Sequence, residues 1–292
     1  MPEPVYPTYT VDGVPMDRAE WYLTPATRQR ALPAKRGVSV EVPGRSGQLP
    51  VTGLDEDAST VTLGLFVTAA RPDGTEGDLP EMNANLDALL GMFGTEHRLL
   101  DVRYFPGPGV ERQADAMVLA GSEPDIDVPI RRARVQLVLT LPGVYWRDPI
   151  TRTWSAPLTG TRGVTTLAGS TAPITDAVVR VKGPATSPSV TDVATGLTVA
   201  YTGTLTGSQW LLIDCGSMRA ARVTSDTWDL AAGTDVTGSV DSTGPRSSSS
   251  WLRLTSAMAA ADPFSRTVMV TGAGSGTDGT TRLEIRARRA YR

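Results

Sequence analysis

One short segment near the N-terminus carries residue types that are suited to chemistry. Residues 41–51, with the sequence EVPGRSGQLPV, hold an arginine and a serine between Gly44 and Gly47. A glycine-rich loop can bind phosphate through backbone N–H groups, and a serine on a sharp turn can act as a nucleophile. The pattern G-x-x-x-x-G-K-[ST] is absent, and Gly47 follows Ser46 directly, so G-x-S-x-G is absent too. We interpret the segment as a turn between two strands.

Partners for a reactive serine are missing as well. The only histidine, His97, follows a predicted helix, and nothing in the sequence pairs it with Ser46. One histidine and one cysteine are too few ligands for a structural zinc site, and the acidic triplet at 55–57 does not fit an EF-hand loop. We therefore expect no catalytic, cofactor-binding or metal-binding residues, and a protein that is not an enzyme.

A second glycine-rich segment, TGAGSGTDG at 271–279, superficially resembles a dinucleotide-binding loop. That fingerprint requires a helix immediately afterwards, whereas residues 282–287 alternate like a strand. We therefore expect 271–279 to be a hairpin loop.

Composition limits the class of protein. The 292 residues are 40% hydrophobic and 20% charged, which predicts a folded chain. No apolar run approaches the ~20 residues that a membrane span requires, so we expect no membrane insertion. The N-terminus lacks the features of a signal peptide, and the single cysteine, Cys215, fits a reducing cytoplasm.

Charge is unevenly distributed along a chain whose net charge is −3. Residues 51–87 contain eight acidic residues against Arg71, whereas residues 282–292 contain five arginines against Glu284. Opposite patches on one chain suit head-to-tail self-association. The alternative is that each patch simply solvates unrelated strands and loops.

The elements that would carry these residues are mostly strands. Apolar side chains alternate through 38–42, 61–68, 100–104 and 135–141, as in half-buried antiparallel strands. One amphipathic helix is predicted from Asp78, its N-cap, to Gly94, its stop, with Pro80 in the first turn and Glu81 completing a capping box. The first half is therefore predicted to lay one helix across a sheet.

The second half reads differently. Residues 150–175, rich in Thr, Ser, Gly and Pro, predict a linker or a loosely packed first strand. Short strands separated by turn residues and without a helix are then predicted at 178–182, 197–201, 210–214, 221–223, 251–254, 268–270 and 283–287. This pattern is typical of a β-sandwich or jelly roll.

The order of four stretches resembles the distal tail protein family of long-tailed, non-contractile phages, whose members are also called minor tail proteins. The stretches are the strand and Pro-Gly-Arg-x-Gly turn at 38–47, the strand 61–68 leading into the helix at 78–93, PGVYWRDP at 142–149, and VVRVKGP at 178–184 followed by SPSVTDVATG. The later strand WLLID at 210–214 also fits the order of the family. The resemblance covers most of the chain.

The resemblance implies a mainly β, structural virion protein of siphophages. Residues 1–149 would form a ring-forming, tail-tube-like β-barrel or split-sheet domain with one helix, and 150–292 a galectin-like or carbohydrate-module-like β-sandwich. Six copies would form a ring at the distal tail tip, joining the tail tube protein to tail-associated and baseplate hub proteins. DNA would pass through the channel without specific binding, and assembly would occur in the cytoplasm of the bacterial host.

Three sets of residues are candidates for roles in such a protein. For the subunit interface we expect Arg45, Arg286 and Arg288. For an acidic loop that faces the lumen and does not retain DNA we expect Asp55, Glu56 and Asp57. The alternative function is a carbohydrate- or receptor-binding module in the second half, with Trp210, Trp228 and Trp251 as stacking residues. Tryptophans on alternating strands more often belong to the core.

Overall fold

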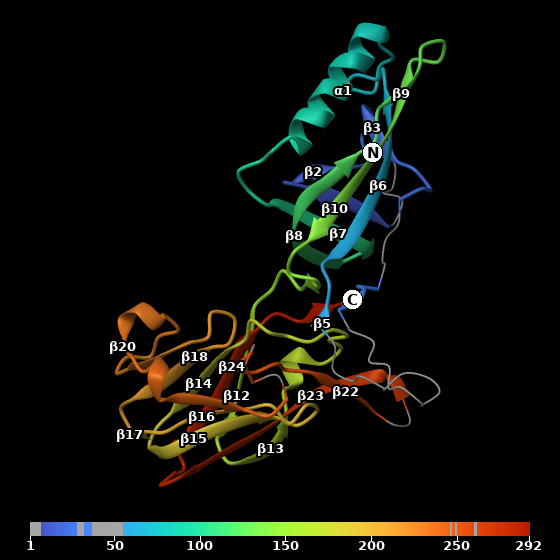
Figure 1. Cartoon of the computed structure of the whole chain (residues 1–292). Coiled ribbons are helices and arrows are strands. Elements are labelled where there is room, and N and C mark those ends of the chain that lie inside the picture. The colour runs from blue at the N-terminus through green and yellow to red at the C-terminus, as the bar shows by residue number, and fades with distance from the viewer. Residues whose placement is uncertain (1–6, 28–31, 37–54, 246, 249, 260–261) are drawn as a thin grey trace, which may run out of the picture. The chain divides into compact units, whose positions relative to one another are not determined.

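The computed structural model describes residues 7–27, 32–36, 55–245, 247–248, 250–259 and 262–292 (Figure 1). The chain divides into two compact units, the first comprising Met1–Arg147 with Arg292 and the second Asp148–Tyr291. Both are mainly β, as predicted. The strand predicted at 38–42 and the turn with Arg45 and Ser46 lie outside the described residues. No helix in the described ranges is both long and apolar enough to cross a membrane.

The first unit is built on one antiparallel sheet that curls into a half-barrel. Its strand order is β2 (Val14–Pro15), β1 (Thr8–Val11), β7 (Leu100–Gly107), β8 (Val110–Gly121), β10 (Arg132–Leu141), β6 (Ser59–Thr68) and β3 (Trp21–Leu23). Short strands add to it or lie beside it: β9 (Asp125–Asp127) pairs with β10, β11 (Trp146–Arg147) pairs with β8, and β4 (Lys35–Arg36) pairs with β5 (Asp55–Glu56). The strands predicted at 61–68, 100–104 and 135–141 are confirmed.

Strand β6 shows why the sheet buries one face. Val61, Leu63, Leu65 and Val67 are at most 2% exposed, whereas Thr62 and Phe66 between them are partly exposed. Leu63 and Leu65 stand opposite Leu137 and Val135 of β10, which are also buried. Because side chains alternate along a strand, the apolar positions of both strands meet on the same side.

Helix α1 (Leu79–Phe93) covers that buried face and contacts β6 and β10 (Figure 1). The carboxylate of Asp78 accepts the Glu81 N–H at 3.1 Å, and the Gly94 N–H donates to Leu90 O, so the predicted boundaries are confirmed. The helix buries Met82, Asn85, Leu86, Leu89 and Phe93. The amide of Asn85 donates to the backbone oxygens of Thr68 and Ala70, which ties the helix to the end of β6.

The segment PGVYWRDP contributes the aromatic part of this core. Trp146 is 4% exposed, and its ring centroid lies 5.6 Å from that of Tyr104, which in turn lies 5.0 Å from Tyr9. Tilted contacts at these distances are favourable beyond the area they bury.

The second unit is a β-sandwich of two antiparallel sheets. One sheet has the order β12 (Arg152–Pro157), β24 (Arg282–Ala287), β14 (Val178–Lys182), β18 (Trp210–Asp214), β19 (Arg219–Val223) and β20 (Thr234–Asp235). The other has the order β13 (Gly160–Gly163), β23 (Asp262–Ser275), β15 (Ala185–Asp192), β16 (Thr198–Tyr201) and β21 (Val240–Thr243), with β17 (Thr204–Leu205) beside β15 and β22 (Ser256–Ala259) beside β23.

Between the strands of this unit lie three short 3-10 turns: η1 (Thr165–Leu167), η2 (Leu230–Ala232) and η3 (Thr237–Ser239). Its described residues include no α-helix. Both sheets contribute to the buried core, which includes Val179, Val181, Leu211, Ile213, Leu283, Val190, Val199 and Val270.

Two local predictions for this unit were wrong, and one was left open. Residues 251–254 alternate and bury Leu252 and Leu254, but only Leu254 makes a ladder contact, with Ile174. Residues 271–275 continue strand β23 rather than forming a loop. A Cβ on Gly272 would meet Leu158 O at 2.0 Å, so this glycine permits close backbone approach inside the sandwich. Of the two alternatives for 150–175, the structure has strands β12 and β13.

Candidate binding and interaction sites

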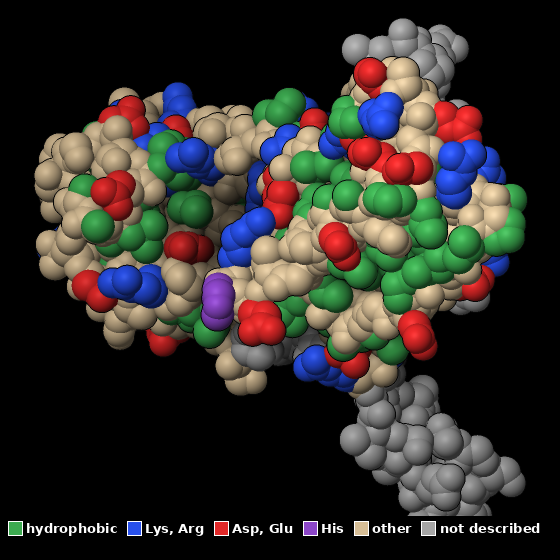
Figure 2. Space-filling view, turned by 90° about the horizontal axis from the view of Figure 1, so that it is seen from above, with side chains coloured by type: hydrophobic (Ala, Val, Ile, Leu, Met, Phe, Trp, Pro, Cys, Tyr) green, Lys and Arg blue, Asp and Glu red, His purple; other side chains and the backbone are tan. Residues whose placement is uncertain are grey.

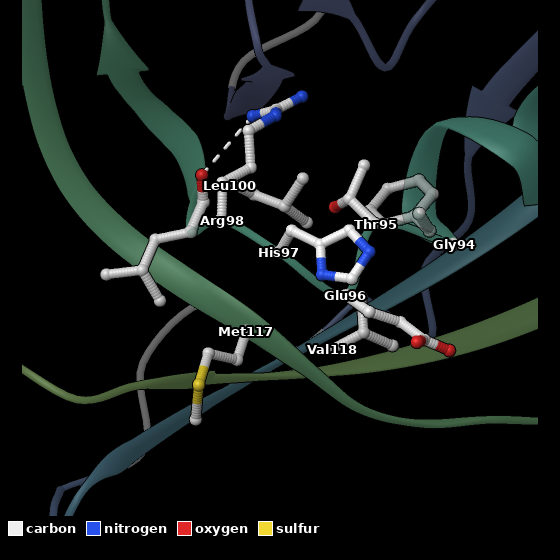
Figure 3. Close-up of a pocket in the computed structure, with 10 residues that line it drawn as sticks. Gly94, Thr95, Glu96, His97, Arg98, Leu100, Met117 and Val118 are labelled. Atoms are coloured by element: carbon white, nitrogen blue, oxygen red, sulfur yellow. Dashed lines mark hydrogen bonds between the residues drawn. The ribbon is translucent and has the colours of Figure 1, made fainter.

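The single histidine lies in an exposed loop between α1 and β7 (purple in Figure 2). The loop forms one wall of a cavity of about 660 Å³, and strand β8 contributes Met117 and Val118. Figure 3 shows the imidazole of His97 at this cavity and the guanidinium of Arg98 directed to the backbone oxygen of Leu99. No serine or cysteine is among the residues lining the cavity. Ser46 is outside the described residues, so its pairing with His97 stays untested.

Arg98 fixes this loop to the β1–β2 hairpin. Its guanidinium donates to both carboxylate oxygens of Asp12, at 2.9 and 2.6 Å. Asp12 and Gly13 form the two-residue hairpin turn, with φ of 49° and 79°, as expected for an Asp-Gly pair. The hydrogen bond from Arg98 is the largest effect on the pKa of Asp12, which lies below its ordinary value. The ion pair between Arg98 and Asp12 therefore has a structural role: it holds in place the loop that forms this wall of the cavity.

The single cysteine is also unsuited to chemistry. Cys215 is 3% exposed, and burial raises the pKa of its thiol far above the ordinary range. Since the thiolate is the reactive form, such a cysteine is inert. Within the described ranges, no group of three or more His, Cys, Asp and Glu residues is arranged to hold a metal ion.

Glu56, one of the three acidic residues expected to line a lumen, is almost fully paired. Its side chain is only 4% exposed and forms ion pairs with Lys35 and with Arg292, the latter at 2.9 Å. The hydroxyl of Tyr145 donates to the same carboxylate at 2.5 Å. Burial opposes ionisation of Glu56, but these hydrogen bonds and charges outweigh it, and its pKa lies below its ordinary value.

The neighbouring acidic positions differ from Glu56 in exposure. Asp57 has a half-exposed side chain that accepts from Arg36 at 2.7 Å. Asp55 is in strand β5, where it stands opposite Arg36. Basic residues from β4 and the C-terminus thus offset part of the charge that the sequence concentrates here. The lumen-facing role of Asp55, Glu56 and Asp57 stays a prediction.

The six tryptophans fall into two groups. Trp21, Trp146 and Trp154 are buried, whereas the three predicted as stacking residues, Trp210, Trp228 and Trp251, are all partly exposed. Trp210 lies on β18 near the Lys182 ammonium, Trp228 in the loop after β19, and Trp251 in the segment before β22. Of the three, Trp228 lines a pocket whose lining includes neither Trp210 nor Trp251.

Trp228 instead meets the two C-terminal arginines that were predicted for a subunit interface. Trp228, Arg286 and Arg288 line one pocket of about 250 Å³ on the second unit, together with Thr151, Asp176, Val178 and Ala287. The guanidinium carbon of Arg286 lies 5.8 Å from the indole centroid. The third arginine of that prediction, Arg45, is outside the described residues.

Arg180, beneath this pocket, was not singled out by the sequence analysis. It is 5% exposed in strand β14, and its guanidinium carbon lies 4.3 Å from the Trp228 centroid. It donates to Glu284 and Asp226, each at 2.6 Å, and to Thr227 O at 3.0 Å. The alternation in 178–182 predicts an outward-facing side chain at 180, but nothing local shows that a loop 46 residues later covers it.

Exposed apolar side chains recur on two consecutive segments of the first unit. Those on β8 and the following hairpin are Met117, Leu119, Ile126, Val128 and Ile130, with exposures of 44–63%. The hairpin lies beside the N-terminal end of α1 (Figure 1), where Arg131 donates to Gly77 O at 2.7 Å. Hydrophobic side chains also gather in one region of the face shown in Figure 2. Clustered exposed apolar side chains are typical of protein-binding surfaces.

Comparison with known proteins rests on solved structures, because no protein-family model and no curated protein matches this sequence. The Dit protein of phage SPP1, described as a paradigm of the hub adsorption apparatus in phages that infect Gram-positive bacteria, is similar with a TM-score of 0.59 at 14% identity. The match covers 98% of this chain and 99% of the SPP1 chain. A chain of the phage P2 baseplate in its activated conformation with Ca is similar at 7% identity, with a TM-score of 0.39 and 98% of each chain covered. The chain therefore has the fold of SPP1 Dit across both units, the distal-tail-protein type of fold that the sequence resemblance implied.

Proposed function

We propose that this protein is a structural component of a phage tail tip, a hub that joins the tail tube to the adsorption apparatus. The observation that carries the proposal is the match to SPP1 Dit, which spans 98% of this chain and 99% of that one. A match over the whole length involves both units in the same order. We further propose that the protein is not an enzyme, which the burial of the Cys215 thiol and its raised pKa support.

In this proposal copies of the chain form a closed ring, of six subunits as the family resemblance implies, and DNA leaves through its channel. The exposed apolar side chains of β8 and the hairpin at 122–131 form the contact with the next copy. Leu119 is the extra residue of a bulge, since Val138 pairs with Ala120 and Leu139 with Val118. A bulge redirects its side chain, and Leu119 is 63% exposed.

The channel in this proposal is lined by side chains that do not retain DNA. Asp57 remains the best candidate among the acidic residues, since its side chain is half exposed whereas that of Glu56 is 4% exposed. Arg45 is kept as a proposed contact between subunits.

Labelling in virions tests the location. An epitope tag on the protein, detected by gold-labelled antibody in electron micrographs, is expected at the distal end of the tail in every labelled particle. Label along the tail tube, on the capsid or only in the unassembled fraction contradicts a tail-tip role. The same tagged particles, dissociated gently, should release this chain together with tube and baseplate proteins.

A second function, binding of a carbohydrate or receptor by the second unit, is favoured by one observation. The three tryptophans expected to stack on sugars are partly exposed, whereas the other three are buried. A glycan array probed with the full chain tests it. Retention on at least one glycan supports this function, and failure to bind any glycan counts against it.

A further inference from the structure

We propose that the pocket formed by Trp228, Arg286 and Arg288 binds a sugar ring that carries a carboxylate or a phosphate group. Every residue lining this pocket belongs to the second unit. The inference rests on the second function proposed above, carbohydrate binding by the second unit, and names the class of sugar; binding of neutral glycans alone would contradict the inference but not that function.

The size of the pocket restricts the ligand. Its volume is about 250 Å³, slightly below the range of roughly 300–1,000 Å³ that holds drug-sized ligands. One sugar ring with its substituent is therefore a better match than an oligosaccharide or a nucleotide. A longer polymer would place a single residue in the pocket.

The indole of Trp228 is held in place from below. Arg180, 5% exposed, donates at 2.6 Å to Asp226 and at 3.0 Å to Thr227 O, the two residues that precede Trp228. The same guanidinium is bound to Glu284 of β24 at 2.6 Å, so the loop is fastened to the sheet. Fixing a side chain before a ligand arrives reduces the entropy lost on binding.

A partly exposed, immobilised indole offers an apolar surface on which the C–H bonds of a sugar ring can pack. Trp228 keeps this exposure although the guanidinium carbons of Arg180 and Arg286 lie 4.3 and 5.8 Å from its centroid. Burying Arg180 costs desolvation energy that a solvated strand position would avoid. The use of a buried arginine to position one surface tryptophan is the feature that points to a ligand.

Two arginines make the pocket selective for anions. Arg286 is exposed and forms no ion pair with the described part of the chain. Arg288 lies 3.8 Å from Asp176, and about a third of each side chain remains exposed, so this pair is loose. Guanidinium groups bind carboxylates and phosphates through paired N–H donors. The carboxylate of Asp176 supplies acceptors for the hydroxyl groups of the sugar.

A tryptophan of the sheet that contains Arg180 serves as a matched control. Trp210 of β18 is also partly exposed and has a cation, the Lys182 ammonium, 5.7 Å from its centroid. It does not line the pocket. Replacing Trp210 therefore removes a similar surface aromatic without touching the proposed site.

The test is calorimetric or NMR titration of the full-length protein with glucuronate, glucose 6-phosphate, glucose and inorganic phosphate. At least one of the two anionic sugars is expected to bind at least tenfold more tightly than glucose and than phosphate alone. Comparison of glucuronate with glucose 6-phosphate identifies which anionic group is preferred. Equal affinity for glucose, equal affinity for phosphate, or no binding of either anionic sugar overturns the proposal.

Variants assign the site. Trp228→Ala is expected to abolish binding, and Arg286→Gln and Arg288→Gln each to weaken it about tenfold, the loss of one charged hydrogen bond. Trp210→Ala should bind like the parent protein. Circular dichroism and amide NMR spectra establish that each variant is folded. Retained binding in folded Trp228→Phe but not in Trp228→Ala supports stacking; unchanged binding in Trp228→Ala refutes it.

Discussion

The two units cover the apolar faces of their antiparallel sheets in different ways. The first curls its sheet around helix α1, and its exposed apolar side chains are concentrated on β8 and the adjoining hairpin. The second packs two sheets together, with the buried Arg180 on one of them and the partly exposed Trp228 in a loop that covers it. Apolar surface is suited to a protein partner, whereas the arginines 286 and 288 beside a fixed indole are suited to a small anionic ligand. The comparison is consistent with the two proposals made above, assembly through the first unit and ligand recognition by the second.

The largest expected effect is the loss of self-association, which should follow a change in the first unit but not a matched change in the second. Leu119→Arg, at the bulge of β8, should abolish self-association, because a charge would be buried in an apolar contact without a partner. Val193→Arg replaces a side chain of similar exposure in the second unit, 48% against 63%, and should leave assembly intact. Analytical ultracentrifugation of both variants measures the difference. Equal assembly of the two, or loss in both, contradicts this division of roles.

Matched cavities in the two cores test whether the units are energetically separate. Leu63 of β6 and Leu211 of β18 are both 0% exposed. Each Leu→Ala change should cost about 2–5 kcal/mol of the stability of its own unit. Hydrogen exchange followed by mass spectrometry should show lost protection in residues 7–147 for Leu63→Ala and in 148–291 for Leu211→Ala. Loss of protection across both units in either variant would mean that they unfold as one.

Arg180 acts as a clamp that fastens the loop of Trp228 to the sheet, and removing it should have a smaller effect on stability. Arg180→Met keeps the length of the side chain but leaves Glu284 without its cation. We expect the free energy of unfolding to fall by about 3 kcal/mol. This is the low end for breaking a buried pair, because the other partner, Asp226, is 74% exposed. Arg222→Met is the control, since Arg222 is partly exposed and forms no ion pair in the described chain, and it should change stability by under ~0.5 kcal/mol. Urea denaturation followed by tryptophan fluorescence measures both. Equal stability of the two variants would show that Arg180 is not a clamp.

Protonation of one aspartate in each unit should change the stability of the two units in opposite directions. The pKa of Asp12 is lowered by Arg98, so this pair stabilises the first unit above pH 3.8 and is lost as the pH falls further, a change of roughly 0.5 kcal/mol for an exposed pair. Burial raises the pKa of Asp192, which is 0% exposed. Its contribution to the second unit therefore grows as the pH falls through that raised pKa towards 3.8. Carboxyl carbon NMR titration should give the two midpoints on opposite sides of 3.8; both below it contradicts the assignment for Asp192.

Much of the fold could be predicted because its signals are local. Alternation in 61–68 and 135–141 identifies two central strands, and the cap at Asp78 and the glycine at 94 identify both ends of α1. Glycine was harder to interpret: Gly272 permits a close approach to Leu158 in a packed sheet, and single-sequence reasoning treats the same residue as a turn. Alternation in 251–254 reflects burial with a single isolated bridge, from Leu254 to Ile174.

The pocket could be predicted only in part, because its residues come from distant segments. Trp228 and the arginines 286 and 288 were candidates for two different roles, and the fold brings them to one place. Arg180 carried no signal, since an arginine between valines looks like any solvent-facing strand position. Similarly, Lys35 and Glu56 are 21 residues apart, so the neutralisation of the acidic triplet required the β4–β5 pairing.

The central claim, that the chain is a ring-forming hub, is tested most directly by electron microscopy of the purified full-length protein. Class averages are expected to show closed rings of identical subunits with a central channel, six-fold as the family resemblance implies, and Leu119→Arg should appear as single particles. Particles that remain monomeric at every concentration, or that form open filaments, would contradict the claim.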